Sequence, residues 1–577
     1  MHRILIIAIV TVLSFGCTEP APPFIGKPAV DQGLKWTLGT RASFYSQDQG
    51  SQIMPISWMK ALKQPNGEPF LASNLTRYGY LENDQNPTSI LPVGFTVAGP
   101  IGGQVIGMTC AACHTRQIEV AGTSYRIDGG PAIADFQSFL ADLDTAVNTV
   151  INDPKAFQGF SGAVLGQPSA PVDQAQLMTE LQAWYLRYHT LISRALPPNP
   201  WGPSRLDAVA MIFNRLTGLD LGPPPSYLIP DNIRTADAPV RYPFLWNAAI
   251  QDKTQWTGFA DNGNDLLALA RNLGEVYGVF GAFQPTKDKS VPFLHVNYIA
   301  GNSANFEGLW KLEDLIKKIG PPKFPWPINS DLAQQGEAIF ARNTDQGGCA
   351  DCHGIRPGTT RPFDEKTWAT PIMDVGTDGR EHDLLARTAQ SGVLSGASIP
   401  YITKPLKSTD TAFNILATAV VGSILQAPFA QELEAQAQLS ASRAGSRVSR
   451  TASMLSATPE MQQLQGAFRA PATTEYKYEA RVMQGIWAAA PYLHNGSVPT
   501  LADLLKPVAE RPASFMVGPA YDPDAVGLAK VQTKFNFTLT TTDCSDRNSG
   551  NSRCGHPYGT NLKPDEKRAL LEYLKKL

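Results

Sequence analysis

Apolar residues recur every three or four positions over long stretches of this chain, which is the spacing of a helix that buries one face. One stretch contains Ile133, Phe136, Phe139, Leu140, Leu143 and Val147, and another contains Leu177, Leu181, Trp184, Tyr188 and Leu191. Proline pairs and triplets such as Pro197-Pro198 and Pro223-Pro224-Pro225 separate segments of this kind. Strict alternation of apolar and polar residues, which would indicate strands, is scarce. The pattern therefore predicts a mainly α-helical protein.

A second helical region is predicted after Pro325-Trp326-Pro327. Asn329 or Ser330 can cap a helix that begins at Asp331. The chain ends with KPDEKRALLEYLKKL, in which acidic residues near the start and lysines near the end suit the helix dipole. We therefore expect two domains, residues 31–325 and 326–577, with long loops and helical insertions.

The first residues have the form of a secretion signal. Arg3 precedes an apolar run, and Gly16-Cys17 ends it. The run is too short to span a bilayer. A small residue followed by cysteine is similar to a bacterial lipoprotein cleavage site, so Cys17 is the predicted lipidation site, with a Pro-rich tether over residues 18–30. Because Ser14 replaces the larger aliphatic residue of that pattern, an ordinary signal is the alternative. Both alternatives predict export from the cytoplasm. An ordinary signal would leave the protein in the periplasm, whereas a lipoprotein signal would attach it to the outer membrane by a lipid anchor, its only membrane contact.

Composition adds exclusions to this picture. The 577 residues are 43% hydrophobic and 17% charged, which is typical of a globular protein. The formal net charge is −2, so nothing favours nucleic acid or an anionic membrane surface as a partner.

Two C-x-x-C-H motifs carry the strongest chemical signal. They comprise Cys110, Cys113 and His114, and Cys349, Cys352 and His353. Two thiols about one helical turn apart can add to the two vinyl groups of one porphyrin, and the following histidine can then coordinate the iron. The sequence predicts two covalently bound haems c. A zinc or thiol-redox site is the alternative, but the motifs lie far apart and each has its own histidine.

The cysteines near the C-terminus have a different predicted role. Cys544 and Cys554 are close in sequence and belong to an exported chain. We expect a disulfide between them, with a pair of free thiols as the alternative.

A sixth iron ligand decides whether a haem only transfers electrons or also binds O2 or peroxide. His556 is the candidate for the second haem, since it follows Cys554 in a Gly-rich turn, and Met516 is a rival. The remaining candidates His189, His295 and His382 are interpreted as structural. His494 is a candidate to bind a haem propionate or to orient a loop.

No equally good ligand is found for the first haem. Four aromatic residues in one segment are predicted to wall a dry, open iron site, with core packing as the alternative: Phe244, Trp246, Trp256 and Phe259. Trp246 or Trp256 could instead lie between the haems. Glu275 is a candidate distal acid, and Arg271 is its alternative partner at helical spacing. Arg126 is a candidate propionate ligand, with a surface salt bridge as the alternative.

Several longer segments together resemble a known family. They are GMTCAACH, YRIDGGPAIADFQSFL, ARNLGEVYGVF, GIWAAAPYLHNGSVPTLADLL and GHPYGTNLKPDEKRALLEYLKKL. They are similar to the rubber-oxygenase-like branch of the di-haem cytochrome c peroxidase superfamily, from about residue 45 to 577. The resemblance implies a mostly helical protein with two cytochrome-like domains. It also implies that His114 and His353 are proximal ligands, that His556 is a distal ligand, and that the first haem is the reaction centre.

The resemblance narrows the function. The branch includes oxygenases that cleave double bonds of polyisoprene and dioxygenases of unsaturated fatty acids, while the wider superfamily includes peroxide reductases. The peroxidases have haem motifs that lie closer together, and their second histidine after the first motif is not found here. The expectation is an O2-dependent dioxygenase of unsaturated hydrocarbon chains. The alternatives are a peroxidase that reduces H2O2 with electrons from a small cytochrome or cupredoxin, and a non-catalytic electron-transfer protein.

Overall fold

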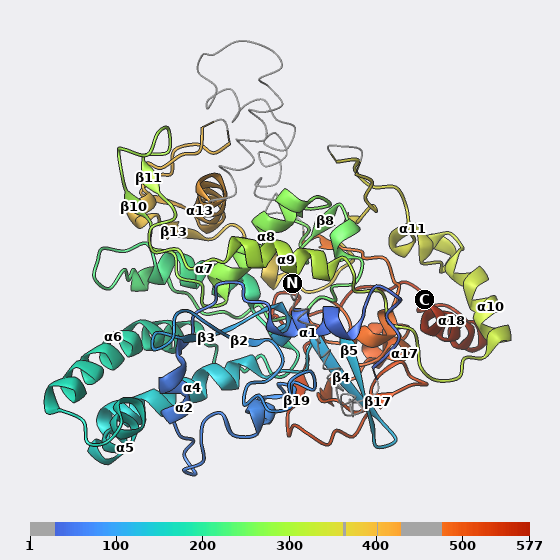
Figure 1. Ribbon diagram of the computed structural model, residues 1–577. Coiled ribbons are helices and arrows are strands. Elements are labelled where there is room, and N and C mark those ends of the chain that lie inside the picture. Colours follow the sequence, from blue (N-terminus) through green and yellow to red (C-terminus); the bar gives the residue numbers. More distant parts are fainter. Residues whose placement is uncertain (1–28, 362–364, 401, 428–475) are drawn as a thin grey trace, which may run out of the picture.

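The computed structural model describes residues 29–361, 365–400, 402–427 and 476–577 (Figure 1). The predicted signal, Cys17 and nearly all of the tether lie outside these residues. No helix in the described part of the chain is both long enough and apolar enough to cross a membrane.

Helices are spread over the whole described chain. The helices before residue 325 are α1 (Leu38–Ser46), α2 (Ile56–Ala61), α3 (Cys110–Cys113), α4 (Phe136–Asn152), α5 (Pro154–Leu165), α6 (Pro171–Ala195), α7 (Ala208–Leu219), α8 (Asp265–Gly278) and α9 (Phe306–Ile316). The C-terminal half contains α10 (Ser330–Phe340), α11 (Ala350–His353), α12 (Arg380–Leu384), α13 (Ala412–Gln426), α17 (Leu501–Leu504) and α18 (Pro564–Lys576). Helices α4 and α6 coincide with the two apolar repeats, and the N-cap Asp135 accepts a hydrogen bond from Ser138 N at the start of α4.

Strands are short and numerous. Those before residue 300 are β1 (Met54–Pro55), β2 (Phe95–Ala98), β3 (Val105–Met108), β4 (Thr115–Val120), β5 (Thr123–Asp128), β6 (Arg205–Leu206), β7 (Val240–Arg241), β8 (Lys253–Thr254), β9 (Ala260–Asp261), β10 (Thr286–Lys287) and β11 (Val296–Asn297). The later ones are β12 (Ile372–Met373), β13 (Thr388–Gln390), β14 (Thr409–Thr411), β15 (Tyr478–Glu479), β16 (Ser514–Met516), β17 (Tyr521–Asp522), β18 (Gly527–Leu528) and β19 (Thr538–Thr540).

The prediction of a mainly α-helical protein was wrong. Helix accounts for 38% of the structure and strand for 14%. The described residues form one three-stranded sheet, in the order β1-β3-β2, and eight two-stranded sheets. All of these named pairs are antiparallel; the longest, β4 with β5, runs from Thr115 opposite Asp128 to Val120 opposite Thr123. Most strands have only two to four residues. This length is too short for an alternating pattern to stand out in the sequence.

The helix that precedes the second C-x-x-C-H motif packs against the C-terminal helix, α10 against α18 (Figure 1). The two backbones come very close at Gly336, where an added Cβ would lie 2.0 Å from the carbonyl oxygen of Ala569. Only glycine fits this contact. The pair supports the segment that carries Cys349, because the backbone N–H of Cys349 donates to Phe340 O at the end of α10 (2.9 Å).

The buried core continues across the predicted boundary at residue 325. One apolar cluster joins Ile118 and Trp246 with Trp487 and Leu570. The other cluster contains α4, α6, α7 and α8 together with α13 from the later part of the chain. The division into residues 31–325 and 326–577 stays a prediction about folding units.

Candidate haem sites

In the first motif, a hydrogen bond from the Nδ1 atom of His114 fixes the orientation of the imidazole ring. His114 follows α3, and its Nδ1–H donates to the carbonyl oxygen of Pro243 at 2.9 Å. This bond leaves Nε2 for a metal and fixes the orientation of the ring. Burial lowers the pKa of His114 to about 4, so the imidazole is in the neutral form that ligation requires.

The second motif repeats the arrangement with unrelated residues. His353 ends α11, and its Nδ1–H donates to the carbonyl oxygen of Arg481 at 2.8 Å. Burial also lowers the pKa of His353. Both predicted proximal histidines therefore have a free Nε2 and a backbone carbonyl behind them, as metal-ligating histidines commonly do.

His556 lies opposite His353. The centres of the two rings are 6.2 Å apart. An iron between two imidazoles needs two bonds of about 2 Å, which places the ring centres roughly 6 Å apart. The buried Nδ1 of His556 has no hydrogen-bond partner among the described residues. The pair thus fits a haem iron with two histidine ligands.

Hydrogen bonds to the backbone hold the loop of His556. The N–H of His556 donates to Val375 O at 2.7 Å. The buried guanidinium of Arg511 donates to three carbonyl oxygens of the same loop, those of Arg553, Gly555 and His556, at 2.8 to 3.0 Å. His556 also has a positive φ of 49°, a conformation that a side-chain-bearing residue keeps only when its surroundings enforce it.

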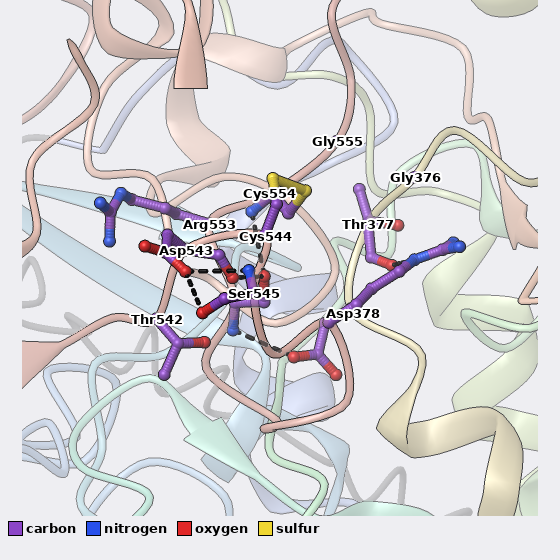
Figure 2. The surroundings of a disulfide bond; sticks show 12 residues. Gly376, Thr377, Asp378, Thr542, Asp543, Cys544, Ser545, Arg553, Cys554 and Gly555 are labelled. Atoms are coloured by element: carbon purple, nitrogen blue, oxygen red, sulfur yellow. Dashed lines mark hydrogen bonds between the residues drawn. A yellow bond between two sulfur atoms is a disulfide. The ribbon is translucent and has the colours of Figure 1, made fainter. Parts of the chain in front are cut away.

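A disulfide joins Cys544 and Cys554 two residues before His556, with a Cα–Cα distance of 5.1 Å. Figure 2 shows it beside residues 376–378. An added Cβ on Gly555 would lie 2.3 Å from the backbone of Gly376, so the two segments touch. The N–H of Ser552 donates to Asp378 at 3.0 Å. The disulfide and these contacts restrict where His556 can lie.

No second histidine faces His114 in the described part of the chain. The ring beside it is Tyr242, nearly perpendicular at 6.2 Å. The other sequence candidates are placed elsewhere: His189 binds Asp144 on the surface, His295 is exposed, His382 lies beside Lys477 O, His494 stacks on Tyr478, and Met516 lies in β16. The first site therefore has a proximal histidine and no described distal one.

A small cavity of about 50 Å³ lies between α7, α8 and α13. Its lining is mostly apolar and comprises Ile212, Gln255, Phe259, Ala260, Asp261, Leu267, Ala270, Arg271, Gly274, Glu275, Leu416 and Val420. Glu275 places the cavity near the first motif. Burial first, and the charge of Glu275 after it, raises the pKa of Cys110 to about 12, and Glu275 acts in the same direction on Cys113.

Glu275 does not pair with Arg271, the partner that helical spacing suggested. Its Oε1 accepts a hydrogen bond from Gln255 at 2.8 Å, and burial raises its pKa. Arg271 instead forms a buried ion pair with Glu313 on α9 at 2.8 Å. Among the described residues the carboxyl group has no salt-bridge partner, and burial raises its pKa although the charge of Arg271 opposes the shift.

The four predicted pocket aromatics are not gathered in one place. Phe259 lines the cavity. Phe244 and Trp246 stack on each other, with ring centres 4.7 Å apart, and the indole of Trp246 donates to Gln484 O at 2.7 Å. The indole of Trp256 donates to Arg241 O at 3.0 Å. Buried indoles need a hydrogen-bond acceptor, and here backbone carbonyls supply it.

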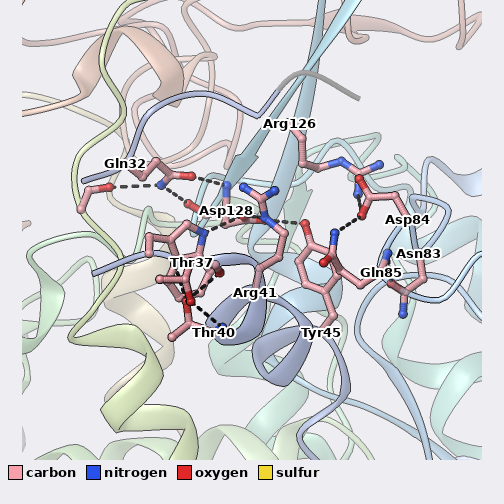
Figure 3. Close-up of polar contacts among 12 residues, drawn as sticks. Gln32, Thr37, Thr40, Arg41, Tyr45, Asn83, Asp84, Gln85, Arg126 and Asp128 are labelled. Atoms are coloured by element: carbon pink, nitrogen blue, oxygen red, sulfur yellow. Dashed lines mark hydrogen bonds and ion pairs between the residues drawn. The ribbon is translucent and has the colours of Figure 1, made fainter. Parts of the chain in front are cut away.

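The two proposed propionate contacts are both buried. Arg126 approaches Asp84 at 3.8 Å (Figure 3), and its Nε has no hydrogen-bond partner among the described residues. Figure 3 also shows the neighbouring carboxylate of Asp128, which accepts from Arg41 and Tyr45. The ring of His494 lies 3.7 Å from that of Tyr478 and nearly parallel to it.

Sequence reasoning missed three arginines near the proximal histidines: Arg116, Arg241 and Arg481. All are at most 8% exposed. Among the described residues, Nε and Nη2 of the Arg116 guanidinium are buried without hydrogen-bond partners. A buried cation without a carboxylate is costly, so Arg116 fits an anionic group such as a haem propionate. The only signal in the sequence was Arg116 two residues after His114.

Comparisons with known proteins extend this picture. Uncharacterized protein y4iJ of Sinorhizobium fredii (strain NBRC 101917 / NGR234) is 29% identical over 599 residues, which cover 94% of this chain and 92% of that protein. Uncharacterized protein y4iM of the same organism is 26% identical over 425 residues, 72% and 74% of the two chains. Residues 477–516 match the family described as RoxA-like, cytochrome c-like. This segment, which includes Arg481 and His494, is thus cytochrome c-like and implies covalently bound haem c, in a haem-dependent oxidoreductase.

Proposed function

We propose that this exported chain carries two haems c and is an O2-dependent oxygenase of unsaturated hydrocarbon chains at the first of them. One observation carries the proposal: His353 has a second histidine at ligand distance, and His114 has none in the described residues. An iron closed by two strong ligands transfers electrons, while an open one binds a gas. The RoxA-like match and the resemblance to rubber oxygenases support the same reaction class.

The residues around the first site have different proposed roles. When bound, haem supplies the redox chemistry and the site for O2. His114 holds the proximal side with its ring fixed by Pro243 O. Apolar side chains, including Phe259, Leu416 and Val420, line the cavity and would contact one part of a hydrocarbon chain, because about 50 Å³ is too small for a whole one. The buried carboxyl group of Glu275 also lines the cavity, and its raised pKa makes it a candidate proton donor.

A peroxidase is the second candidate, and Glu275 is the observation that favours it. A neutral buried carboxyl near the first haem could give a proton to a leaving oxygen during cleavage of H2O2. That reaction needs electrons from a donor such as a small cytochrome or cupredoxin.

Oxygen uptake separates the candidates. The purified haem-loaded protein is incubated with oleate, with polyisoprene, and separately with H2O2 plus a reduced cytochrome. Stearate is the matched control for oleate, since it has the same length without the double bond. Oxygen uptake with an unsaturated chain, without added electrons and not with stearate, supports the oxygenase. Turnover only with peroxide and donor contradicts it.

A further inference from the structure

Arg481 connects the two proximal histidines. Its carbonyl oxygen accepts the hydrogen bond from His353 Nδ1–H at 2.8 Å. Its guanidinium donates through Nη1 to the carbonyl oxygen of Phe244 at 2.8 Å. Phe244 directly follows Pro243, whose carbonyl oxygen accepts from His114 Nδ1–H. The two histidine rings are therefore linked through Arg481 by three hydrogen bonds: His353 to Arg481 O, Arg481 to Phe244 O, and His114 to the adjacent Pro243 O.

The guanidinium of Arg481 is fixed on several sides. Nε and Nη2 both donate to Gln251 Oε1, at 3.0 and 2.7 Å. Its central carbon lies 4.1 Å from the ring centre of Phe244. The side chain is only 7% exposed. A cation held this tightly cannot move away when the charge of a nearby iron changes, so its electrostatic effect on that iron persists.

A second buried cation belongs to these surroundings. Arg241 is 5% exposed, and the carboxyl group of Glu479 lies 3.6 Å from Arg481 Nε. A buried positive charge disfavours the additional positive charge of a ferric iron relative to a ferrous one.

We propose that Arg481 is a positioning residue that couples the two haem sites: it orients the proximal histidine of each and raises the reduction potential of both. The inference rests on both motifs carrying haem and does not depend on the reaction at the first one. Loss of oxygenase activity would therefore leave it standing.

The geometry makes the consequences of substitution unequal. Every residue at position 481 keeps the backbone carbonyl that holds His353. Arg481→Gln removes the charge and the bond to Phe244 O. Arg481→Lys keeps the charge, but a lysine has no planar fork to bind Gln251 and Phe244 together. The charge effect thus acts on both haems, and the orientation effect acts on the first.

The test uses the full haem-loaded protein, with Arg205→Gln as the matched control. Arg205 is also buried, and its side chain binds the carbonyl oxygens of Trp201 and Asn495. In the described part of the chain this side chain makes no hydrogen bond to Pro243, Phe244 or Arg481. Haem content is checked first, and then the potential of each haem is titrated and the ferric EPR spectrum is recorded. Arg481→Gln should shift the ferric–ferrous equilibrium of both haems roughly tenfold toward ferric, about 59 mV per electron.

Arg481→Lys should keep the potential of the second haem and change the EPR signal of the first. Unchanged potentials in Arg481→Gln, or an equal shift in Arg205→Gln, would overturn the proposal. If Arg481→Gln does not load haem, the lysine variant decides, and an unchanged first-haem signal contradicts the coupling.

Discussion

The ring centres of His353 and His556 lie 6.2 Å apart, although the two residues are far apart in the sequence. The two histidines are brought together by a loop that a disulfide, Arg511 and Val375 O all hold. His114 has the same hydrogen bond from Nδ1–H to a backbone carbonyl, and among the described residues no second histidine ring lies beside it. This asymmetry is the basis of our proposal that one site transfers electrons and the other carries out the chemistry.

Replacing His556 should open the second iron. His556→Ala removes the only described imidazole that faces His353, so the ferric haem there should change from low-spin to high-spin. Absorbance and EPR spectra of the purified variant measure this change. His189→Ala, which alters a surface pair with Asp144, is the control and should leave both spectra as in the wild type. A low-spin second haem in His556→Ala would mean that another residue is the ligand.

Removing the disulfide should loosen the same loop. The double variant Cys544→Ser/Cys554→Ser frees a loop with a sequence separation of 10, and the entropy gained by the unfolded chain lowers the free energy of unfolding by roughly 3 kcal/mol. Urea unfolding followed by the Soret band measures it, with Ser545→Ala in the same loop as the control. Stability equal to that of the control would show that the hydrogen bonds hold the loop alone.

The two C-x-x-C-H motifs stand out in the sequence because covalent haem attachment requires these residue types within five positions. Their role as haem-attachment sites stays a prediction. Helices α4, α6 and α18 could be predicted because each buries one face over at least three turns. The strand pairs could not be predicted. β12 pairs with β15 through only two residues on each strand, which leaves no local pattern.

The partners of Glu275 and Arg271 near the first site could not be predicted from the sequence, because tertiary contacts determine them. Helical spacing suggested Arg271 for Glu275, but Glu313 on the neighbouring helix α9 binds Arg271 instead. The contact of Arg481 with His353 could not be predicted either, because it is made by the backbone carbonyl of Arg481, which every residue type has. Trp246 and Phe259 lie close in sequence but in different surroundings. Trp246 donates to Gln484 O, whereas Phe259 lines the cavity.

Filling the cavity should block the substrate without closing the iron. Leu416→Trp adds a large side chain to the apolar lining, and kcat/KM with oleate should fall roughly tenfold or more. Oxygen uptake gives the rate, and CO binding shows whether the iron is still open. Leu186→Trp on the exposed face of α6 is the control. Equal rates in the two variants would place the hydrocarbon chain elsewhere.

Glu479 should make stability depend on pH. Burial raises its pKa from 4.5 to about 7, although Arg481 and Arg241 oppose the shift. A raised pKa means that the folded state prefers the neutral acid, so its contribution is complete below about pH 4.5 and is lost as the pH rises through about 7. Across that window the wild type should lose roughly 3 kcal/mol relative to Glu479→Gln, whose side chain never ionises. Urea unfolding from pH 5 to 8 measures both slopes, and parallel slopes would exclude this role.

The stoichiometry of carbon monoxide binding tests the central claim most directly. CO binds ferrous haem where a coordination position is open and competes poorly with two strong histidine ligands. The fully reduced protein, with two haems per chain confirmed by haem analysis, is titrated with CO and followed by absorbance. The asymmetry between His114 and His353 predicts one CO per chain. Two CO per chain, or none, would contradict it.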